Sequence, residues 1–183
     1  MIAKLASQNA PKLEELRAAL PGWELELLGA AEFPSEDGDT YYENARGKAE
    51  FGRFVAGPEA WAIGEDSGIE LAGLGGRPGV HSARWAADGV ARTLETLAGA
   101  DDRRARYVCE LVALSPDGTE LRGTGILEGT IAAEPRGSEG FGYDPIFVPE
   151  GEKQTVAELG NAWKREHSHR ALAARALRSA FRT

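Results

Sequence analysis

The acidic stretch Glu65-Asp66-Ser67-Gly68 contains the residues best suited to metal chemistry in this 183-residue sequence. It follows Trp61-Ala62-Ile63, a short apolar segment that predicts a buried strand ending just before the acids. Ligands of open α/β sheets bind beyond the carboxyl ends of strands, and Mg²⁺ usually takes one or two carboxylates with water and substrate phosphates. The stretch therefore predicts a magnesium site. A turn that leaves the strand, with Gly68 in a left-handed conformation, explains the residues equally well.

Adjacent side chains of an extended chain point to opposite sides, so only one of Glu65 and Asp66 needs to face such a site. Glu43 is a candidate second carboxylate for a metal ion bound by Asp66. It lies in the first turn of a predicted helix, and Thr40 with Glu43 has the spacing of a capping box. Taken alone, Glu43 is better explained as an acid stabilised by the helix dipole.

The segment Ser7-Gln8-Asn9-Ala10-Pro11-Lys12 connects a predicted strand, Ile2 to Ala6, with a predicted helix whose buried face carries Leu13, Leu16 and Leu20. Hydroxyl, amide and ammonium donors at a helix N-terminus can bind a phosphate chain. The glycine-rich P-loop pattern is absent, and capping of the helix is the structural alternative.

The loop Gly140-Phe141-Gly142-Tyr143-Asp144-Pro145-Ile146-Phe147 offers aromatic rings that can stack on a base. Pro145 forces Asp144 toward an extended conformation, which fixes the direction of its carboxylate. Anchoring of the loop in the core explains the same rings equally well.

The segment Lys164-Arg165-Glu166-His167-Ser168-His169-Arg170 is a candidate anion site. Ser168 is a predicted helix cap, which places His169 and Arg170 in the positively polarised first turn. From Asn161 onward there are six Lys and Arg, Arg182 included, against one acid, although the net charge is −8. Such a local cluster suits a compact anion rather than a nucleic acid polymer. By charge alone, a solvated helix with arginine on its outer face is favoured. Zinc binding by His167 and His169 is the rival interpretation, but it lacks further cysteine or histidine ligands except His81.

The remaining pattern predicts strands at 23–28, 106–114 and 119–133, a turn at 115–118 and a glycine-rich loop at 71–77. The helix after Thr40 is predicted to bury Ala45, Ala49, Phe51 and Val55, and the last helix Leu172, Ala176, Leu177, Ala180 and Phe181. Strands alternating with helices predict a mixed α/β fold.

The chain length fits a single domain over 1–183, built of one body or of two lobes sharing a core. No apolar run is long enough to span a membrane. The single cysteine, Cys109, excludes an internal disulfide, so we expect a reducing, cytoplasmic setting.

Together and in this order, these stretches resemble the inosine-triphosphate pyrophosphatase family, which clears non-standard purine nucleoside triphosphates. The matching residues are Ser7-x-Asn9-x-x-Lys12, Glu43-Asn44-Ala45-x-x-Lys48-Ala49, Asp66-Ser67-Gly68, Gly76 to Arg84, the loop 140–147, and Lys164 with Ser168-His169-Arg170. The resemblance spans nearly the whole chain.

The resemblance implies two lobes around a long, bent mixed β-sheet with helices on its faces, and an active site in the cleft between the lobes. It implies a homodimer that uses Mg²⁺ to hydrolyse ITP, dITP or XTP to the monophosphate and pyrophosphate, by attack at the α-phosphorus. By similarity, Asp66 is the catalytic carboxylate and binds the metal with Glu43, and Glu65 is a further candidate ligand. Residues Ser7 to Lys12, Lys164 and Arg170 would bind phosphates, whereas Ser67, Phe141, Gly142, Tyr143, Asp144 and His169 would hold ribose and base.

The sequence departs from the family pattern at three places. Glu65 replaces the first aspartate of the acidic pair, the phosphate segment lacks a glycine, and the stretch 86–103 is shortened. Two rival functions are a Maf-like nucleotide pyrophosphatase with another base preference and a non-catalytic regulator that binds nucleotides.

Overall fold

The computed structural model describes residues 1–181, so Arg182 of the basic segment lies outside the described residues. One six-stranded sheet has the strand order β2-β1-β3-β4-β5-β6. The strands are β1 (Ile2–Leu5), β2 (Glu24–Leu27), β3 (Trp61–Leu71), β4 (Arg104–Leu114), β5 (Glu120–Ile131) and β6 (Phe147–Pro149). The α-helices are α1 (Ala10–Ala19), α2 (Tyr41–Val55), α3 (Gly89–Thr96), α4 (Val156–His167) and α5 (His169–Ala180), with short 3₁₀ helices at Ala72–Leu74 and Gly79–Arg84. Strand β1 is parallel to β2 and β3, whereas β5 and β6 are antiparallel. The predicted mixed α/β fold is confirmed.

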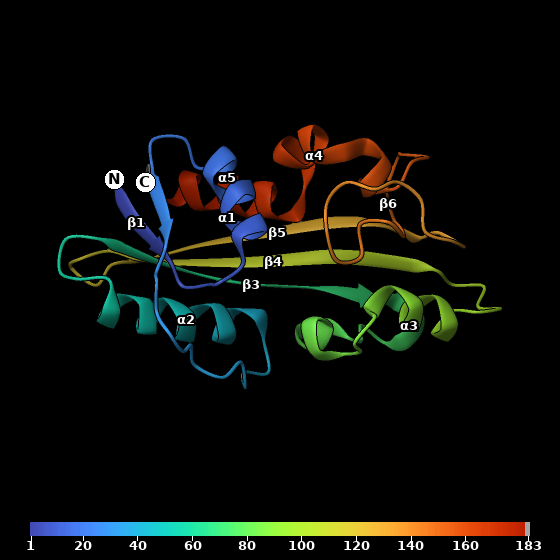
Figure 1. Cartoon of the computed structure of the whole chain (residues 1–183), viewed down its shortest axis with the longest axis horizontal. Coiled ribbons are helices and arrows are strands. Elements are labelled where there is room, and N and C mark those ends of the chain that lie inside the picture. Colours follow the sequence, from blue (N-terminus) through green and yellow to red (C-terminus); the bar gives the residue numbers. More distant parts are fainter. Residues whose placement is uncertain (182–183) are drawn as a thin grey trace. The chain divides into compact units, whose positions relative to one another are not determined.

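The chain divides into two compact units. The first comprises Met1–Asp66, Cys109–Gly125 and the chain from Arg170 onward, and the second comprises Ser67–Val108 and Ile126–His169. In the first unit, α1 and α5 lie on one face of the sheet and α2 on the other (Figure 1). Its main core is made of side chains from the strands and from α1 and α5, including Leu5, Leu16, Ile63, Leu111 and Leu177.

The second unit has its own core. Ile69, Leu97, Tyr107, Ile146 and Phe147 are all buried in it, and partly buried side chains of α3 and α4 pack against them. Over residues 1–181, no helix combines the length and the apolar character that crossing a membrane requires.

The approach of α2 to β3 depends on Gly64. A Cβ atom at this position would lie 1.8 Å from the carbonyl oxygen of Ala45 and 2.7 Å from the amide nitrogen of Ala49. Only glycine therefore permits this packing. The contact brings the first turns of α2 next to the acidic stretch that follows Gly64.

The prediction that the strand at 61–63 ends before the acidic stretch is wrong. Strand β3 continues to Leu71, and Gly68 within it does not have a positive φ. The strand continues because Glu65 and Asp66, although buried, have charged partners, and a paired charge can be tolerated inside. The alternative interpretation, a turn that leaves the strand at Gly68, is therefore wrong as well.

The sequence pattern missed α3 and α4. A signal for each is visible in hindsight: Asp88 accepts a hydrogen bond from the Ala91 amide, and Thr155 with Glu158 forms a capping box. Gly160 inside α4 has non-helical angles, which interrupts the helical periodicity.

Two predicted buried faces were partly wrong. Ala45 and Ala49 of α2 are buried, but Val55 is 42% exposed at the end of the helix. In α5, Leu177 is buried as predicted, whereas Phe181, which follows the end of the helix, is 45% exposed.

Candidate functional site

A cavity of about 430 Å³ in the first unit collects several of the predicted phosphate-binding residues. It is lined by Ala6, Ser7, Gln8, Asn9, Lys12, Phe33, Pro34, Glu36 and Lys48. The lining therefore combines hydroxyl and amide groups with two lysines, which are groups that bind phosphates.

The N-terminal segment also caps its helix. The side chain of Asn9 accepts a hydrogen bond from the Lys12 amide at 3.0 Å, and the Ser7 hydroxyl accepts one from the Asn9 amide at 3.0 Å. Ala10 and Pro11 form the first turn of α1, and neither is among the residues that line the cavity. Ser7 and Asn9 therefore both stabilise the start of α1 and line the cavity, and their hydrogen bonds hold the segment in place.

Asp66 is buried and contacts two side chains of α2. Its Oδ2 accepts a hydrogen bond from Asn44 at 3.1 Å, and its Oδ1 lies 3.2 Å from the Lys48 ammonium. Burial raises the pKa of Asp66, although Lys48 and Asn44 oppose that shift. A carboxylate with a raised pKa is a better proton acceptor than an ordinary aspartate.

The sequence interpretation missed Glu36. The Lys48 ammonium forms ion pairs with Glu36 and Asp66 and also donates to the Glu65 carbonyl oxygen at 2.9 Å. Two carboxylates thus face one cation. An available signal was the acidic run that begins at Glu36, just before the capped helix.

Glu43 has a structural role in α2. It is exposed, and it completes the predicted capping box. The Thr40 amide donates a hydrogen bond to Glu43 Oε2 at 2.9 Å, and the Glu43 amide donates one to Thr40 Oγ1 at 3.1 Å. The capping-box prediction is confirmed. Within residues 1–181, no three His, Cys, Asp or Glu side chains gather as a potential metal site.

Glu65 and Asp66 have different sets of partners, as the alternation of side chains along an extended chain predicts. The Glu65 carboxylate is 2.5 Å from Lys12 Nζ and 2.9 Å from Arg170 Nε, and the Cys109 thiol lies 3.7 Å away. Burial alone would raise the pKa of Glu65, but the charges of Lys12 and Arg170 outweigh it and hold the pKa well below its usual range. With both oxygens bound to cations, the geometry does not favour Glu65 as a metal ligand.

A second polar cluster surrounds Asp144 in the second unit. Asp144 accepts hydrogen bonds from Lys164 at 2.7 Å, from the Tyr107 hydroxyl at 3.2 Å and from the Phe141 amide at 2.8 Å. The Lys164 ammonium also lies 4.3 Å from the centre of the Phe141 ring. A Cβ on Gly140 would collide with the Asp144 carboxylate at 2.2 Å, so glycine is required there. Lys164 is therefore engaged in shaping the loop.

The other residues predicted to hold ribose and base also lie in the second unit. Tyr143 donates to the Ser82 carbonyl oxygen at 2.9 Å, and the His169 ring stacks on Tyr107 with centroids 4.5 Å apart. Ser67 is half-buried on β3, and Gly142 takes a positive φ of 64° in the loop. Each cluster forms within its own unit, and the single cleft site that joins them stays a prediction.

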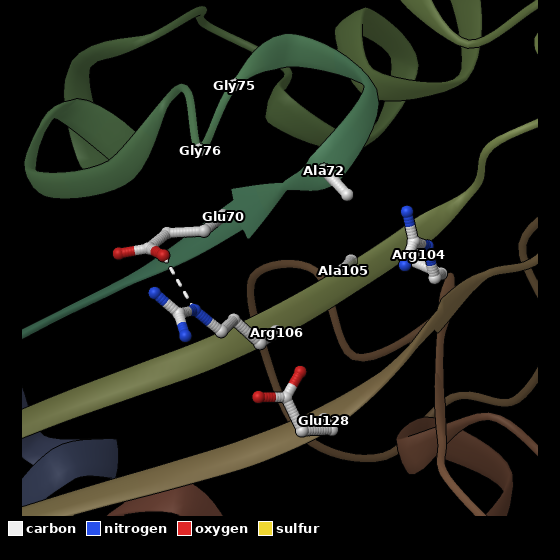
Figure 2. A pocket seen from close by; sticks show the side chains of 8 residues that line it. All are labelled: Glu70, Ala72, Gly75, Gly76, Arg104, Ala105, Arg106 and Glu128. Carbon is white, nitrogen blue, oxygen red and sulfur yellow. Dashed lines mark hydrogen bonds and ion pairs between the residues drawn. The ribbon is translucent and has the colours of Figure 1, made fainter.

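Another cavity, of about 510 Å³, lies in the second unit. Its lining includes Glu70 and Arg106, which form an ion pair at 2.7 Å, together with Arg104 and Glu128 (Figure 2). None of the predicted site residues lines this cavity, and Glu70 and Arg106 neutralise each other. The chemistry favours the cavity of the first unit.

Comparisons with known proteins identify the family. The model of the Ham1 family matches residues 3–180. A Bdellovibrio bacteriovorus protein named dITP/XTP pyrophosphatase is 39% identical, over 98% of this chain and 96% of its own. A Deinococcus radiodurans protein of the same name is 43% identical, over 96% of this chain and 90% of its own. The solved Ham1 protein of Staphylococcus aureus is 32% identical with a TM-score of 0.86, covering 100% of this chain and 98% of that structure. The resemblance inferred from the motifs is confirmed, and the chain belongs to the Ham1 family.

Proposed function

We propose that this protein hydrolyses non-standard purine nucleoside triphosphates such as dITP, XTP and ITP to the monophosphate and pyrophosphate. The observation that carries the proposal is the first-unit cavity, in which Lys48 links phosphate-binding groups to the buried Asp66. Relatives about 40% identical over nearly the whole chain are named for action on dITP and XTP, which supports this substrate class.

Mg²⁺ is part of the proposal, and the residues present fit it. Glu36 and Asp66 already share one cation, the Lys48 ammonium, and two carboxylates with substrate phosphates are an ordinary set of magnesium ligands. Glu36 and Asp66 would hold the ion, and Glu36 thereby takes the place that the motifs assigned to Glu43. When bound, the ion would neutralise charge on the phosphate oxygens and make a water molecule easier to deprotonate.

The protein's own groups then position the substrate and move one proton. Ser7, Lys12 and Lys48 bind phosphate oxygens, which offsets the negative charge that an attacking water meets. The Asp66 carboxylate accepts the proton of that water. Asn44 holds the carboxylate in the orientation that this transfer needs.

The loop around Asp144 is the proposed site for the base. Phe141 offers a ring for stacking, and Lys164 and Asp144 fix the loop that carries it. Hydrogen-bond donors of the protein that face the 6-oxo group of the base would lose their acceptor if adenine, which has a 6-amino group, were bound instead. A buried mismatch of this kind can discriminate by several powers of ten.

The proposal extends to the state of the protein in the cell. We propose a cytoplasmic homodimer, with residues 1–183 acting as a single functional domain. Sedimentation velocity on the purified protein tests the dimer, since a species of 19.5 kDa would contradict it.

The decisive experiment for the proposed function is pyrophosphate release from ITP, XTP, dITP, GTP, ATP and TTP, with Mg²⁺ and with EDTA. Magnesium-dependent release confined to the three non-standard purine nucleotides supports the proposal. Preferred hydrolysis of a pyrimidine nucleotide would favour a Maf-like activity. Tight binding without turnover of any of them would indicate a regulator.

A further inference from the structure

Three elements of the first unit meet at the Glu65 carboxylate. Lys12 reaches it from α1 at 2.5 Å, and Arg170 reaches it from α5 at 2.9 Å. Arg170 also forms an ion pair with Glu15 of α1 at 3.1 Å. The four side chains form a line of alternating charge that runs from Glu15 through Arg170 and Glu65 to Lys12.

The four side chains differ in exposure. The side chain of Lys12 is 18% exposed and lines the cavity, whereas those of Glu65 and Arg170 are 1% and 5% exposed. Arg170 is therefore buried behind Glu65, and neither residue is among those that line the cavity. Buried charges persist only when they are paired, so this line of charges fixes the position of Lys12.

We propose that Glu65 is a positioning residue that acts through Lys12. Supported by Arg170, it holds the Lys12 ammonium at the wall of the cavity, where the phosphate chain binds. This inference rests on the proposed function. It differs from the metal-ligand role that the acidic motif suggests for Glu65 and from the phosphate-binding role that the family resemblance implies for Arg170.

A double-mutant cycle tests the inference, with binding of inorganic pyrophosphate measured by calorimetry in K12M, E65Q and the double variant. We expect K12M to weaken binding about tenfold or more and E65Q several-fold, with the double variant equal to K12M, because coupled residues are not additive. Effects that multiply would overturn the inference. So would tighter binding by E65Q, which is what removal of a negative charge alone would cause.

Two further readouts separate positioning from other roles. The Mg²⁺ concentration that half-saturates activity should stay within twofold of wild type in E65Q, whereas a tenfold rise would make Glu65 a metal ligand and overturn the inference. E65D retains the charge, so it should lose less pyrophosphate affinity than E65Q. This difference between E65D and E65Q should disappear when both are combined with K12M. If E65Q does not fold, the cycle of E65D with K12M takes its place.

The matched control is E26Q. Glu26 pairs with Lys4 at the same 2.5 Å, but the pair lies outside the cavity and its side chains are 63% and 26% exposed. E26Q should bind pyrophosphate as wild type does, and a loss equal to that of E65Q would overturn the inference.

The positioning role and the proposed function can fail separately. If wild type binds pyrophosphate with the expected coupling but hydrolyses no nucleotide, the proposed function fails and the positioning role stands. If wild type hydrolyses the non-standard nucleotides but Glu65 and Lys12 are not coupled, the proposed function stands and the positioning role fails. Absence of pyrophosphate binding by wild type also overturns the positioning role.

Discussion

Both units of this protein contain buried carboxylates bound to lysines, and Glu65 in the first unit and Asp144 in the second serve different ends. Glu65 pairs with Lys12, which lines a cavity. Asp144 pairs with Lys164, whose side chain is only 2% exposed. Asp144 also accepts a hydrogen bond from the Phe141 amide. The same kind of ion pair thus presents a cation in the first unit and an aromatic ring in the second. We infer that the first unit binds the phosphates and the second binds the base.

The largest effect should follow from Asp66→Asn in the first unit. An amide cannot accept the proton of the attacking water, so kcat should fall by about 10²–10⁴ for every nucleotide substrate. Pyrophosphate-release assays on dITP and XTP measure this, and circular dichroism checks that the fold is intact. Near-wild-type turnover by a folded variant would contradict the role of Asp66.

Asp144→Asn should break the cluster of the second unit. Lys164 would lose its buried counter-charge, which typically costs about 3–5 kcal/mol of folding free energy. Chemical denaturation measures the loss. An unchanged free energy of unfolding would show that Lys164 finds another partner, and the ion pair would then not explain the loop.

The fold class could be predicted from the sequence, and the arrangement of the site only in part. Leu13, Leu16 and Leu20 are buried as the helical spacing predicts, because local periodicity reports which face of a helix is covered. The role of Glu65 was not predictable, since its partners Lys12 and Arg170 are 53 and 105 residues away in sequence. Glu36 was not predicted as a site residue because it lies outside the family motifs. It is linked to Asp66 by Lys48, which forms ion pairs with both carboxylates.

Phe141→Ala tests whether the second unit binds the base while the first unit binds the phosphates. Loss of base stacking typically costs about 1–3 kcal/mol, so KM for dITP should rise by roughly five- to 160-fold. Affinity for inorganic pyrophosphate should not change. If pyrophosphate binding weakens as much as dITP binding, the division of labour between the units is wrong.

A matched pair, Glu36→Gln and Glu43→Gln, compares two candidate metal ligands within the first unit. We expect the first to raise the half-saturating Mg²⁺ concentration about tenfold. The second should have little effect, since glutamine also completes a capping box. Titration of activity with Mg²⁺ measures both, and the opposite ranking would restore Glu43 as the ligand.

The smallest expected effect is a shift in the titration of Asp66 in the metal-free protein. Burial raises the pKa of this carboxyl, so on acidification it should take up its proton at a higher pH than an ordinary aspartate does. NMR titration of the metal-free protein measures this pKa. A pKa equal to that of an ordinary aspartate would contradict the buried environment of Asp66.

The most direct test of the proposed chemistry is hydrolysis of dITP in ¹⁸O-labelled water with Mg²⁺, followed by mass spectrometry of the products. Attack at the α-phosphorus predicts one ¹⁸O atom in the nucleoside monophosphate and none in pyrophosphate. Label in pyrophosphate, or release of inorganic phosphate with a nucleoside diphosphate, would contradict the proposed reaction.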